Sequence, residues 1–435
     1  MLIGWTALLA VALWTVDWSV FGYRWTNGHL VREVGLLAYA FYDAGSQAWR
    51  GAFEDVADVD PTPYVSFTLE RHARRTAMLA RLAGSAESTH GERRKNIILL
   101  QLESVDAAAL DATLDGAPAM PFFRALRDRT WSFDNVIDQT GVGRSSDAHV
   151  LVLASLIPTQ NEPIFTRRDL SDTISLPKLL APRGYHCFSM EGSEGEFWRW
   201  QVNHQRLGYH VSYSKSELDD TDRLGWGVSD RSLIVQAATK MREHVARSPQ
   251  QPFLAHVVLL TNHHPFTFVR DALGRTTGGI LQDYLLSVRY TDEVIELLFG
   301  ELERSGLLDR TIVAVYSDHD SGISDELETS LGRTYRPGSE NERIPLMIWG
   351  LGAPRRITRP TGLQDLAPTI LTAIGLPIPP RFVGIPGQLD SADVLLQNGT
   401  RVTGLTEGGL PVVSPIDVDI RTHSLLAIER PSVLP

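Results

Sequence analysis

The sequence has a single cysteine, Cys187, in 435 residues, which excludes an intramolecular disulfide and a cysteine-based metal cluster. It also has no basic excess, because 41 Lys and Arg face 52 Asp and Glu, for a formal net charge of -11. That balance, with no zinc-finger spacing and no long basic run, argues against nucleic-acid binding. Repeats and low-complexity tracts are absent too. A hydrophobic share of 43% indicates an ordinary globular protein.

The N-terminus lacks the basic region and the small-residue cleavage site of a secretory signal. It is nevertheless apolar from Leu2 to Val16, and after Asp17 the apolar run continues to Tyr23. A membrane span needs about 20 apolar residues, and the tryptophans here suit a membrane interface. We therefore expect a transmembrane anchor over residues 1–25, with a buried soluble helix as the alternative.

Residues 26–94 read as a helical juxtamembrane connector. His29–Phe53 and Ser66–Leu82 have the periodicity of amphipathic helices. The second is rich in arginine, and such a segment can lie on anionic lipid headgroups or simply face solvent.

From Lys95 onward, short apolar runs alternate with helical patterns. This alternation predicts an α/β domain over residues 95–390 with a mostly parallel central sheet flanked by helices. Residues 391–435 form a C-terminal extension of unassigned role. The predicted strands are Asn96–Leu102, Trp131–Ile137, Tyr185–Met190, Phe253–Leu260, Thr311–Tyr316 and Ile344–Trp349, and the predicted helices are Pro121–Arg129, Leu176–Leu180, Leu233–Ala246, Leu281–Glu303 and Asp365–Ile374.

Polar residues follow three of these strands at the point where each strand ends. Glu103 follows the first strand, His263 follows the fourth, and Asp318 with His319 follows the fifth. The carboxyl ends of parallel strands share one edge of a sheet, which is where α/β proteins bind ligands. Each residue alone has an ordinary explanation as an exposed strand end, but together they predict a site.

A glycine-bracketed turn supplies a hydroxyl near that site. Ser145 and Ser146 follow Gly141 and Gly143 and begin an apolar helix. Serine at this position is often only a helix cap. The start of a helix also binds anions, and Arg144 would assist there.

Glu103, Ser145, Asp318 and His319 offer three oxygens and one nitrogen to a divalent cation. That donor set suits manganese or magnesium, and zinc is possible; manganese is the ion we expect. A bound cation lowers the pKa of a hydroxyl, which makes Ser145 a usable nucleophile near neutral pH. The site thus predicts phosphoryl or sulfuryl transfer.

At these residues the chain resembles the lipoteichoic acid synthase and phosphoglycerol transferase group of the sulfatase/alkaline phosphatase superfamily. The likeness runs from about His29 to Gly387, and its motifs are specific only as a set. They are ILLQLES (98–104), QTGVGRSSDA (139–148), SLPKLLAPRGYHCFSMEG (175–192), FWRW (197–200), WGVSD (226–230), LLTNHHPF (259–266), the stretch from YTDEV to SDHDSGIS (290–324) and LQDLAPTILTAIGLP (363–377).

The resemblance implies an α/β catalytic domain outside the cytoplasmic membrane, with Glu103, Ser145, Asp318 and His319 as metal ligands. Ser145 would also be the nucleophile. Trp198 and His263 fall at substrate-binding positions. We expect Trp198, Trp200 and His263 to line one pocket with Ser145, and the alternative is that both tryptophans are core residues. The sequence departs from the family at Trp200, which replaces an arginine that holds a substrate phosphate; the adjacent Arg199 could compensate.

The resemblance further implies the reaction and its partners. We expect a membrane-anchored transferase that faces the periplasm or the cell exterior. It would move phosphoglycerol from an anionic phospholipid such as phosphatidylglycerol, through a covalent Ser145 intermediate, to a hydroxyl of a glycan or glycolipid. Ordinary sulfatases need a modifiable Cys or Ser followed by x-Pro-x-Arg, which is missing after Ser145. A phosphoethanolamine transferase, a phosphodiesterase and a metal-free binding module remain alternatives.

Overall fold

The computed structural model describes residues 56–85, 95–159, 162–338, 340–390 and 393–435. The predicted anchor over 1–25 and the first connector helix lie outside these ranges. Within them, no helix combines the length and the apolar character needed to cross a membrane. Residues Pro61–Pro435 form one compact unit, which takes in the C-terminal extension.

An eight-stranded sheet runs through the unit in the order β12-β4-β11-β10-β1-β9-β5-β6. Only β11 is antiparallel to its neighbours, so the prediction of a mostly parallel sheet is confirmed. The strands are β1 (Asn96–Leu102), β4 (Trp131–Ile137), β5 (His186–Glu191), β6 (Val211–Tyr213), β9 (Phe253–Val258), β10 (Thr311–Ser317), β11 (Arg343–Trp349) and β12 (Arg355–Gly362).

The three central strands form because their apolar runs are covered on both faces. Every residue of β1, β9 and β10 is buried, as expected for parallel strands between two helical layers. The edge strands β6 and β12 were not predicted, because β6 has three residues and β12 is interrupted by charged residues and Pro360. The sheet therefore extends further on both sides than the apolar runs indicate.

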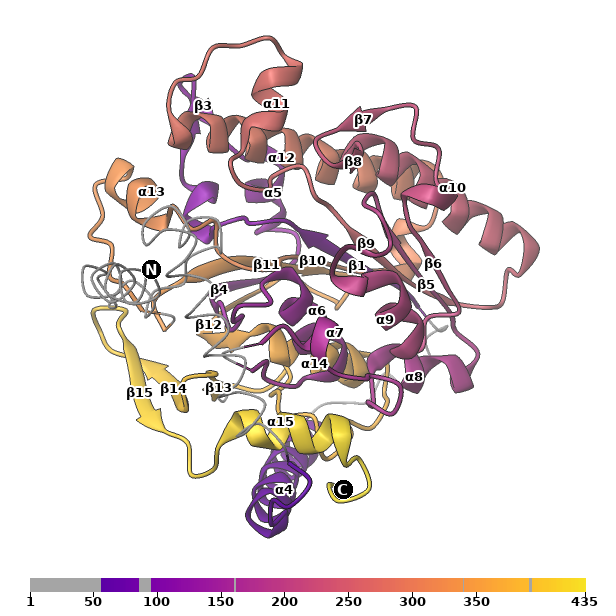
Figure 1. The fold of residues 1–435 in the computed structure, drawn as a ribbon, viewed down its shortest axis with the longest axis vertical. Coiled ribbons are helices and arrows are strands. Elements are labelled where there is room, and N and C mark those ends of the chain that lie inside the picture. The colour runs from indigo at the N-terminus through magenta and orange to yellow at the C-terminus, as the bar shows by residue number, and fades with distance from the viewer. Residues whose placement is uncertain (1–55, 86–94, 160–161, 339, 391–392) are drawn as a thin grey trace, which may run out of the picture. The chain divides into compact units, whose positions relative to one another are not determined.

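Helices cover both faces of the sheet (Figure 1). One layer contains α5 (Pro121–Leu126), α10 (Asp230–Arg247) and α12 (Ile280–Arg304), with α11 (Thr267–Ala272) packed on α12. The other contains α6 (Ser145–Ala154), α7 (Ile164–Arg167), α8 (Leu176–Leu180), α9 (Trp200–Arg206) and α14 (Leu366–Ala373). Outside these layers lie α13 (Ser324–Ser330) and two short hairpins, β2 (Thr113–Leu114) with β3 (Ala117–Pro118) and β7 (Arg223–Leu224) with β8 (Gly227–Val228).

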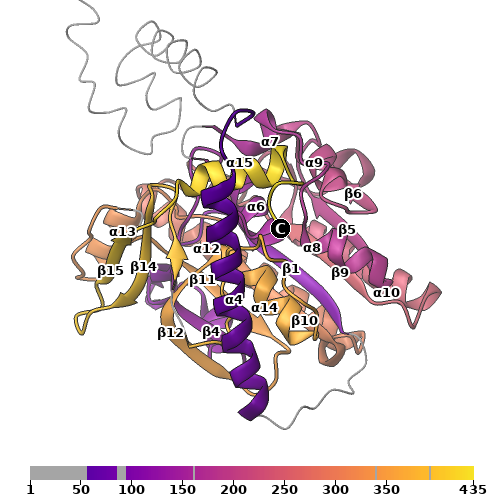
Figure 2. The same ribbon diagram turned by 90° about the horizontal axis from the view of Figure 1, so that it is seen from below.

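The second connector helix, α4 (Thr62–Ser85), lies against the rest of the unit (Figure 2). Two arginines of this helix, Arg71 and Arg75, are buried. Arg71 forms an ion pair with Asp393, and its Nη2 donates to the Asp393 carbonyl at 3.1 Å. Arg75 donates to the carbonyls of Pro379 at 2.9 Å and Gly384 at 3.1 Å. The arginine-rich face thus contacts protein at these two positions.

The C-terminal extension also packs on the unit. It forms a small antiparallel sheet of β13 (Val394–Leu395), β14 (Thr400–Leu405) and β15 (Pro411–Pro415), followed by α15 (Ile420–Glu429). Gln397 donates to the carbonyl of Thr140 at 2.5 Å, directly before the glycine-bracketed turn. The extension therefore supports the loop that carries Ser145.

Candidate active site

The carboxyl ends of β1 and β10 bring Glu103, Asp318 and His319 together. All three are buried, and their donor atoms lie within 4.8 Å of one another. His319 Nε2 is 3.5 Å from Glu103 Oε1 and 3.4 Å from Asp318 Oδ2. The strands are paired in parallel register, Leu102 beside Ser317, so the residues that follow them meet at one edge of the sheet.

Hydrogen bonds between side chains and the main chain hold the two strand ends. Asp318 Oδ1 accepts from the backbone N–H of Ser104 at 2.9 Å and of His319 at 2.8 Å. The Asn262 amide, at the end of β9, donates to the carbonyls of Glu103 and Ser104 at 3.0 Å each. Three adjacent strands are thereby tied together beside the acidic groups.

The turn before Ser145 folds back on the first turn of its own helix. Asp147 Oδ2 accepts from the backbone N–H of Gly141 at 2.8 Å and of Gly143 at 3.1 Å. A Cβ on Gly143 would lie 2.2 Å from Asp147 Oδ1, and one on Gly141 would lie 2.5 Å from Gln397 Oε1. Glycine is required here because the carboxylate and the Gln397 side chain take the space of a methyl group.

Ser145 is the hydroxyl that reaches the strand-end cluster. Its Oγ lies 3.3 Å from Glu103 Oε2 and 3.3 Å from His319 Nε2. Ser146 points elsewhere and donates to the carbonyl of Gly143 at 2.8 Å. The alternative that a serine here is only a helix cap is therefore wrong for Ser146, because α6 begins without a side-chain cap and the Ser146 hydroxyl donates to a carbonyl instead.

The four donor groups fit a divalent cation. Ligands placed tetrahedrally at about 2.1 Å from an ion lie about 3.4 Å apart, which matches the 3.3–3.5 Å separations. Asp318 Oδ2 is buried and has no hydrogen-bond partner among the residues that the structure describes. Burial and the neighbouring Glu103 charge raise the pKa of Asp318. A cation would give that oxygen a partner and offset the repulsion between the two carboxylates.

His319 is oriented by its second ring nitrogen. Nδ1 lies 2.7 Å from the main-chain carbonyl of Asp320, and a proton on Nδ1 leaves the lone pair of Nε2 toward Ser145. Arg144 Nη2 lies 2.9 Å from the same Nδ1 and forms an ion pair with Asp320, while Nη1 lies 3.8 Å from Asp138. The Arg144 guanidinium therefore faces the acidic group of Asp138 and Asp320 in this structure.

A buried carboxylate that sequence reasoning missed lies at the end of β5. Burial, together with the charges of Glu103 and Asp318, raises the pKa of Glu191 to about 8. The Ser193 hydroxyl donates to Glu191 Oε1, and Trp200 Nε1 lies 3.2 Å from Ser193 Oγ. Trp200 is 2% exposed, so its indole packs inside the protein. Glu191 directly follows a predicted strand, Tyr185–Met190, and a polar residue directly after a strand is the same signal that identified Glu103.

The predicted substrate-binding residues Trp198 and His263 are joined by two aromatic residues. The Trp226 ring lies 4.0 Å from His263 and 5.8 Å from Phe197, and Phe197 lies 6.1 Å from Trp198. We call Phe197, Trp198, Trp226 and His263 the aromatic rim. Phe197 and Trp226 are exposed by 43% and 44%. Arg199, the expected compensating cation, is exposed next to the rim.

Comparisons with known proteins agree with this architecture. Lipoteichoic acid synthase 1 of Bacillus subtilis (strain 168) is 30% identical over 400 residues, covering 87% of this chain and 60% of that protein. The chain thus spans 60% of that relative's length, less than two thirds. The lipoteichoic acid synthase LtaP from Listeria monocytogenes superposes with a TM-score of 0.67 at 19% identity, covering 84% of this chain and 99% of that chain.

A further superposition is with the Streptococcus pyogenes phosphoglycerol transferase GacH in complex with sn-glycerol-1-phosphate. Its TM-score is 0.54 at 14% identity, covering 74% of this chain and 86% of that chain. At such identities the two superpositions establish the fold alone. The sulfatase family model matches residues 95–376. Because that match takes in most of the chain, from β1 through α14, the chain belongs to the sulfatase family.

Proposed function

We propose that this protein is a metal-dependent phosphoglycerol transferase. It moves phosphoglycerol from an anionic, phosphatidylglycerol-like phospholipid to a hydroxyl of a glycan or glycolipid. Residues 1–25 anchor it in the cytoplasmic membrane, with the catalytic domain on the outer side. The sequence match to a lipoteichoic acid synthase supports this substrate class.

The position of Ser145 is the observation that carries the proposal. Ser145 is the first residue of α6. Its hydroxyl oxygen lies 3.3 Å from the Glu103 carboxylate and 3.3 Å from the His319 imidazole. We propose that Glu103, Ser145, Asp318 and His319 hold one divalent cation, manganese by preference. When bound, the cation would lower the pKa of the Ser145 hydroxyl and compensate negative charge on the phosphate. The helix N-terminus adds main-chain N–H groups that favour an anion.

The reaction takes place in two displacements at one phosphorus atom. In the first, Ser145 Oγ bonds to phosphorus, loses its proton, and the bond to the diacylglycerol oxygen breaks; that oxygen takes up a proton. In the second, the acceptor hydroxyl bonds to phosphorus, loses its proton, and the bond to Oγ breaks. Ser145 recovers a proton, and phosphoglycerol is left on the acceptor.

His263 is the candidate for binding the donor phosphate or moving a proton. Its Nδ1 lies 2.8 Å from the carbonyl of His264, and a proton there leaves Nε2 free to accept one. Trp198 and Trp226 provide ring faces of the kind that cover a glycerol or sugar. With Trp200 buried, Arg199 is the nearest candidate in the FWRW motif for a phosphate contact.

Mass analysis after incubation with single phospholipids tests the proposal. The purified full chain with manganese and phosphatidylglycerol should gain one phosphoglyceryl group and release diacylglycerol, and a metal chelator should prevent both. An adduct formed only from phosphatidylethanolamine would favour a phosphoethanolamine transferase. Release of glycerol phosphate to water without an acceptor would favour a phosphodiesterase. No lipid turnover with any bound cation would contradict enzymatic function.

Replacing Gly143 with alanine should lower turnover by about 10²-fold, because displacing Asp147 shifts Ser145 and small misplacements of a reacting group are costly. The new Cβ would lie 2.2 Å from Asp147 Oδ1. The control is Gly404→Ala in β14, where a Cβ would meet nothing within 4 Å. Diacylglycerol release measures the rate and circular dichroism the fold. Equal turnover in Gly143→Ala and Gly404→Ala would show that the turn does not position Ser145.

Replacing Trp226 with alanine should raise the KM for the phospholipid by about fivefold with a smaller change in kcat. The centroid of the Trp226 ring lies 4.0 Å from that of His263, with the two planes tilted by 51°, and Trp226 is 44% exposed. Losing an aromatic contact costs roughly 1 kcal/mol. Val235→Ala removes an equally exposed apolar side chain (43%) from α10 and is the control. A change in kcat alone would place Trp226 outside the binding surface.

A further inference from the structure

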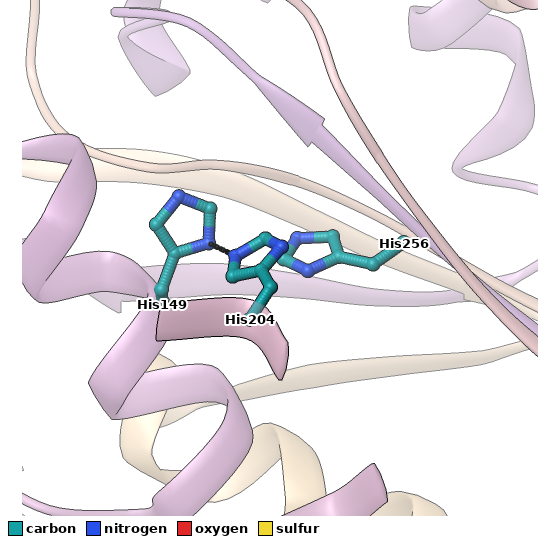
Figure 3. Close-up of side chains that lie close together, drawn as sticks. All are labelled: His149, His204 and His256. Atoms are coloured by element: carbon teal, nitrogen blue, oxygen red, sulfur yellow. Dashed lines mark hydrogen bonds between the residues drawn. The ribbon is translucent and has the colours of Figure 1, made fainter. Parts of the chain in front are cut away.

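Three histidines that the proposed reaction does not use meet in the core beneath α6. His149 lies one turn after Ser145 on α6, His204 is on α9, and His256 is on β9. Figure 3 shows the three rings converging from these elements. One nitrogen of each ring lies within 4.8 Å of the others. We call these residues the histidine cluster.

We propose that the histidine cluster binds one zinc ion, separate from the cation at Ser145. Imidazole nitrogens suit zinc, whereas the oxygen-rich group around Glu103 suits manganese or magnesium. The ion would be held by His149, His204 and His256. This proposal is independent of the proposed function, because none of the three side chains is part of the reacting set.

The spacing of the rings supports a shared ion. His149 Nδ1 and His204 Nε2 are 3.3 Å apart. Two nitrogens bound tetrahedrally to zinc at about 2.0–2.1 Å are about 3.3 Å apart, whereas the usual hydrogen-bond distance is about 2.9–3.0 Å. The separation of these two nitrogens is therefore that of two ligands of one zinc ion.

The surroundings keep the rings neutral, as metal ligands must be. The exposed fractions are 3% for His149 and 0% for His204 and His256. Burial lowers the pKa of His149 to about 3 and takes the pKa values of the other two well below the ordinary range. Phe165 stacks on His149 at 5.3 Å, which adds apolar cover over the site.

Tyrosines supply the remaining parts of a zinc site. Tyr316 Oη lies 3.0 Å from His256 Nε2 and donates to Gln101 Oε1 at 3.1 Å, so Nε2 donates to Tyr316. Such an outer hydrogen bond orients metal-bound imidazoles. It leaves His256 Nδ1 as the ligand atom. Tyr209 Oη lies 3.1 Å from that Nδ1 and is the candidate for the fourth position, either directly or through a water molecule.

Metal analysis of the full chain tests the inference. The protein is loaded with zinc and manganese, then desalted, and both metals are counted per chain. Wild type should hold one zinc ion that survives in Glu103→Gln, which disrupts only the strand-edge cation. Zinc should be lost in His149→Gln and in His204→Gln. His423→Gln, which changes a fully buried histidine of α15 outside the cluster, should keep it.

X-ray absorption on zinc-loaded wild type gives a result that does not depend on the folding of a variant. Three imidazoles in the first shell of a zinc ion that survives Glu103→Gln would support the proposal. Zinc lost in Glu103→Gln but kept in folded His204→Gln would overturn it, as would a first shell dominated by oxygen. Wild type without any zinc beyond the strand-edge cation would overturn it as well.

Discussion

Replacing Ser145 with alanine should abolish phospholipid turnover, with a loss of at least about 10⁴-fold, the scale seen when an enzyme loses its nucleophile. The covalent phosphoglyceryl group should disappear at the same time. The reason is geometric, since Ser145 Oγ is the hydroxyl within 3.3 Å of both Glu103 and His319. Mass analysis of the intact protein and release of labelled diacylglycerol measure the two effects.

Ser146→Ala is the matched control for that experiment. Its hydroxyl donates to the carbonyl of Gly143 at 2.8 Å, so removing it should cost about 1 kcal/mol of stability and leave most of the activity. An adduct that persists in Ser145→Ala would overturn the assignment. An adduct mapped to Ser146 by peptide analysis would name the replacement.

Replacing Arg71 with methionine should lower the free energy of unfolding by about 3–5 kcal/mol, because it takes the buried partner away from the buried Asp393 and leaves only the exposed Arg74 near it. The side chains of Arg71 and Asp393 are 8% and 3% exposed. Methionine keeps most of the side-chain volume, so the loss reports the charge and its hydrogen bonds. Urea unfolding of the full chain, followed by tryptophan fluorescence, measures the effect.

Arg74→Ala is the control, because Arg74 is 58% exposed and its Nη1 lies 3.8 Å from the same Asp393. Exposed ion pairs contribute about 0–1 kcal/mol, so this variant should unfold close to wild type. The double replacement Arg71→Met with Asp393→Leu should recover part of the loss. Equal stability of Arg71→Met and Arg74→Ala would show that the buried pair does not hold α4.

The central part of the sheet could be predicted from sequence, because short, continuous apolar runs are typical of parallel strands that are buried on both faces. β1 and β4 have the predicted bounds, and Glu103 and Asp318 meet because parallel strands end at one edge. Glu191 escaped notice because one acidic residue after a strand is common. The roles of the site residues, the cation and the domain limits remain predictions that biochemical measurements can decide.

What sequence reasoning could not supply is the partner of each polar side chain. Arg71 has the spacing of an exposed amphipathic face, yet it pairs with Asp393, 322 residues away. Trp200 replaces an arginine in the FWRW motif, yet its indole lies inside the protein, beside Ser193. Such pairings depend on the three-dimensional path of the chain. Local periodicity cannot distinguish a solvated arginine from one that binds distant carbonyls.

The docking of α4 has a mechanical consequence. Arg71 and Arg75 bind carbonyls and a carboxylate from residues 379–393, so the helix and the catalytic sheet move as one body. α4 therefore belongs to the catalytic unit, Pro61–Pro435, and any displacement of this helix would first have to break its bonds to residues 379–393.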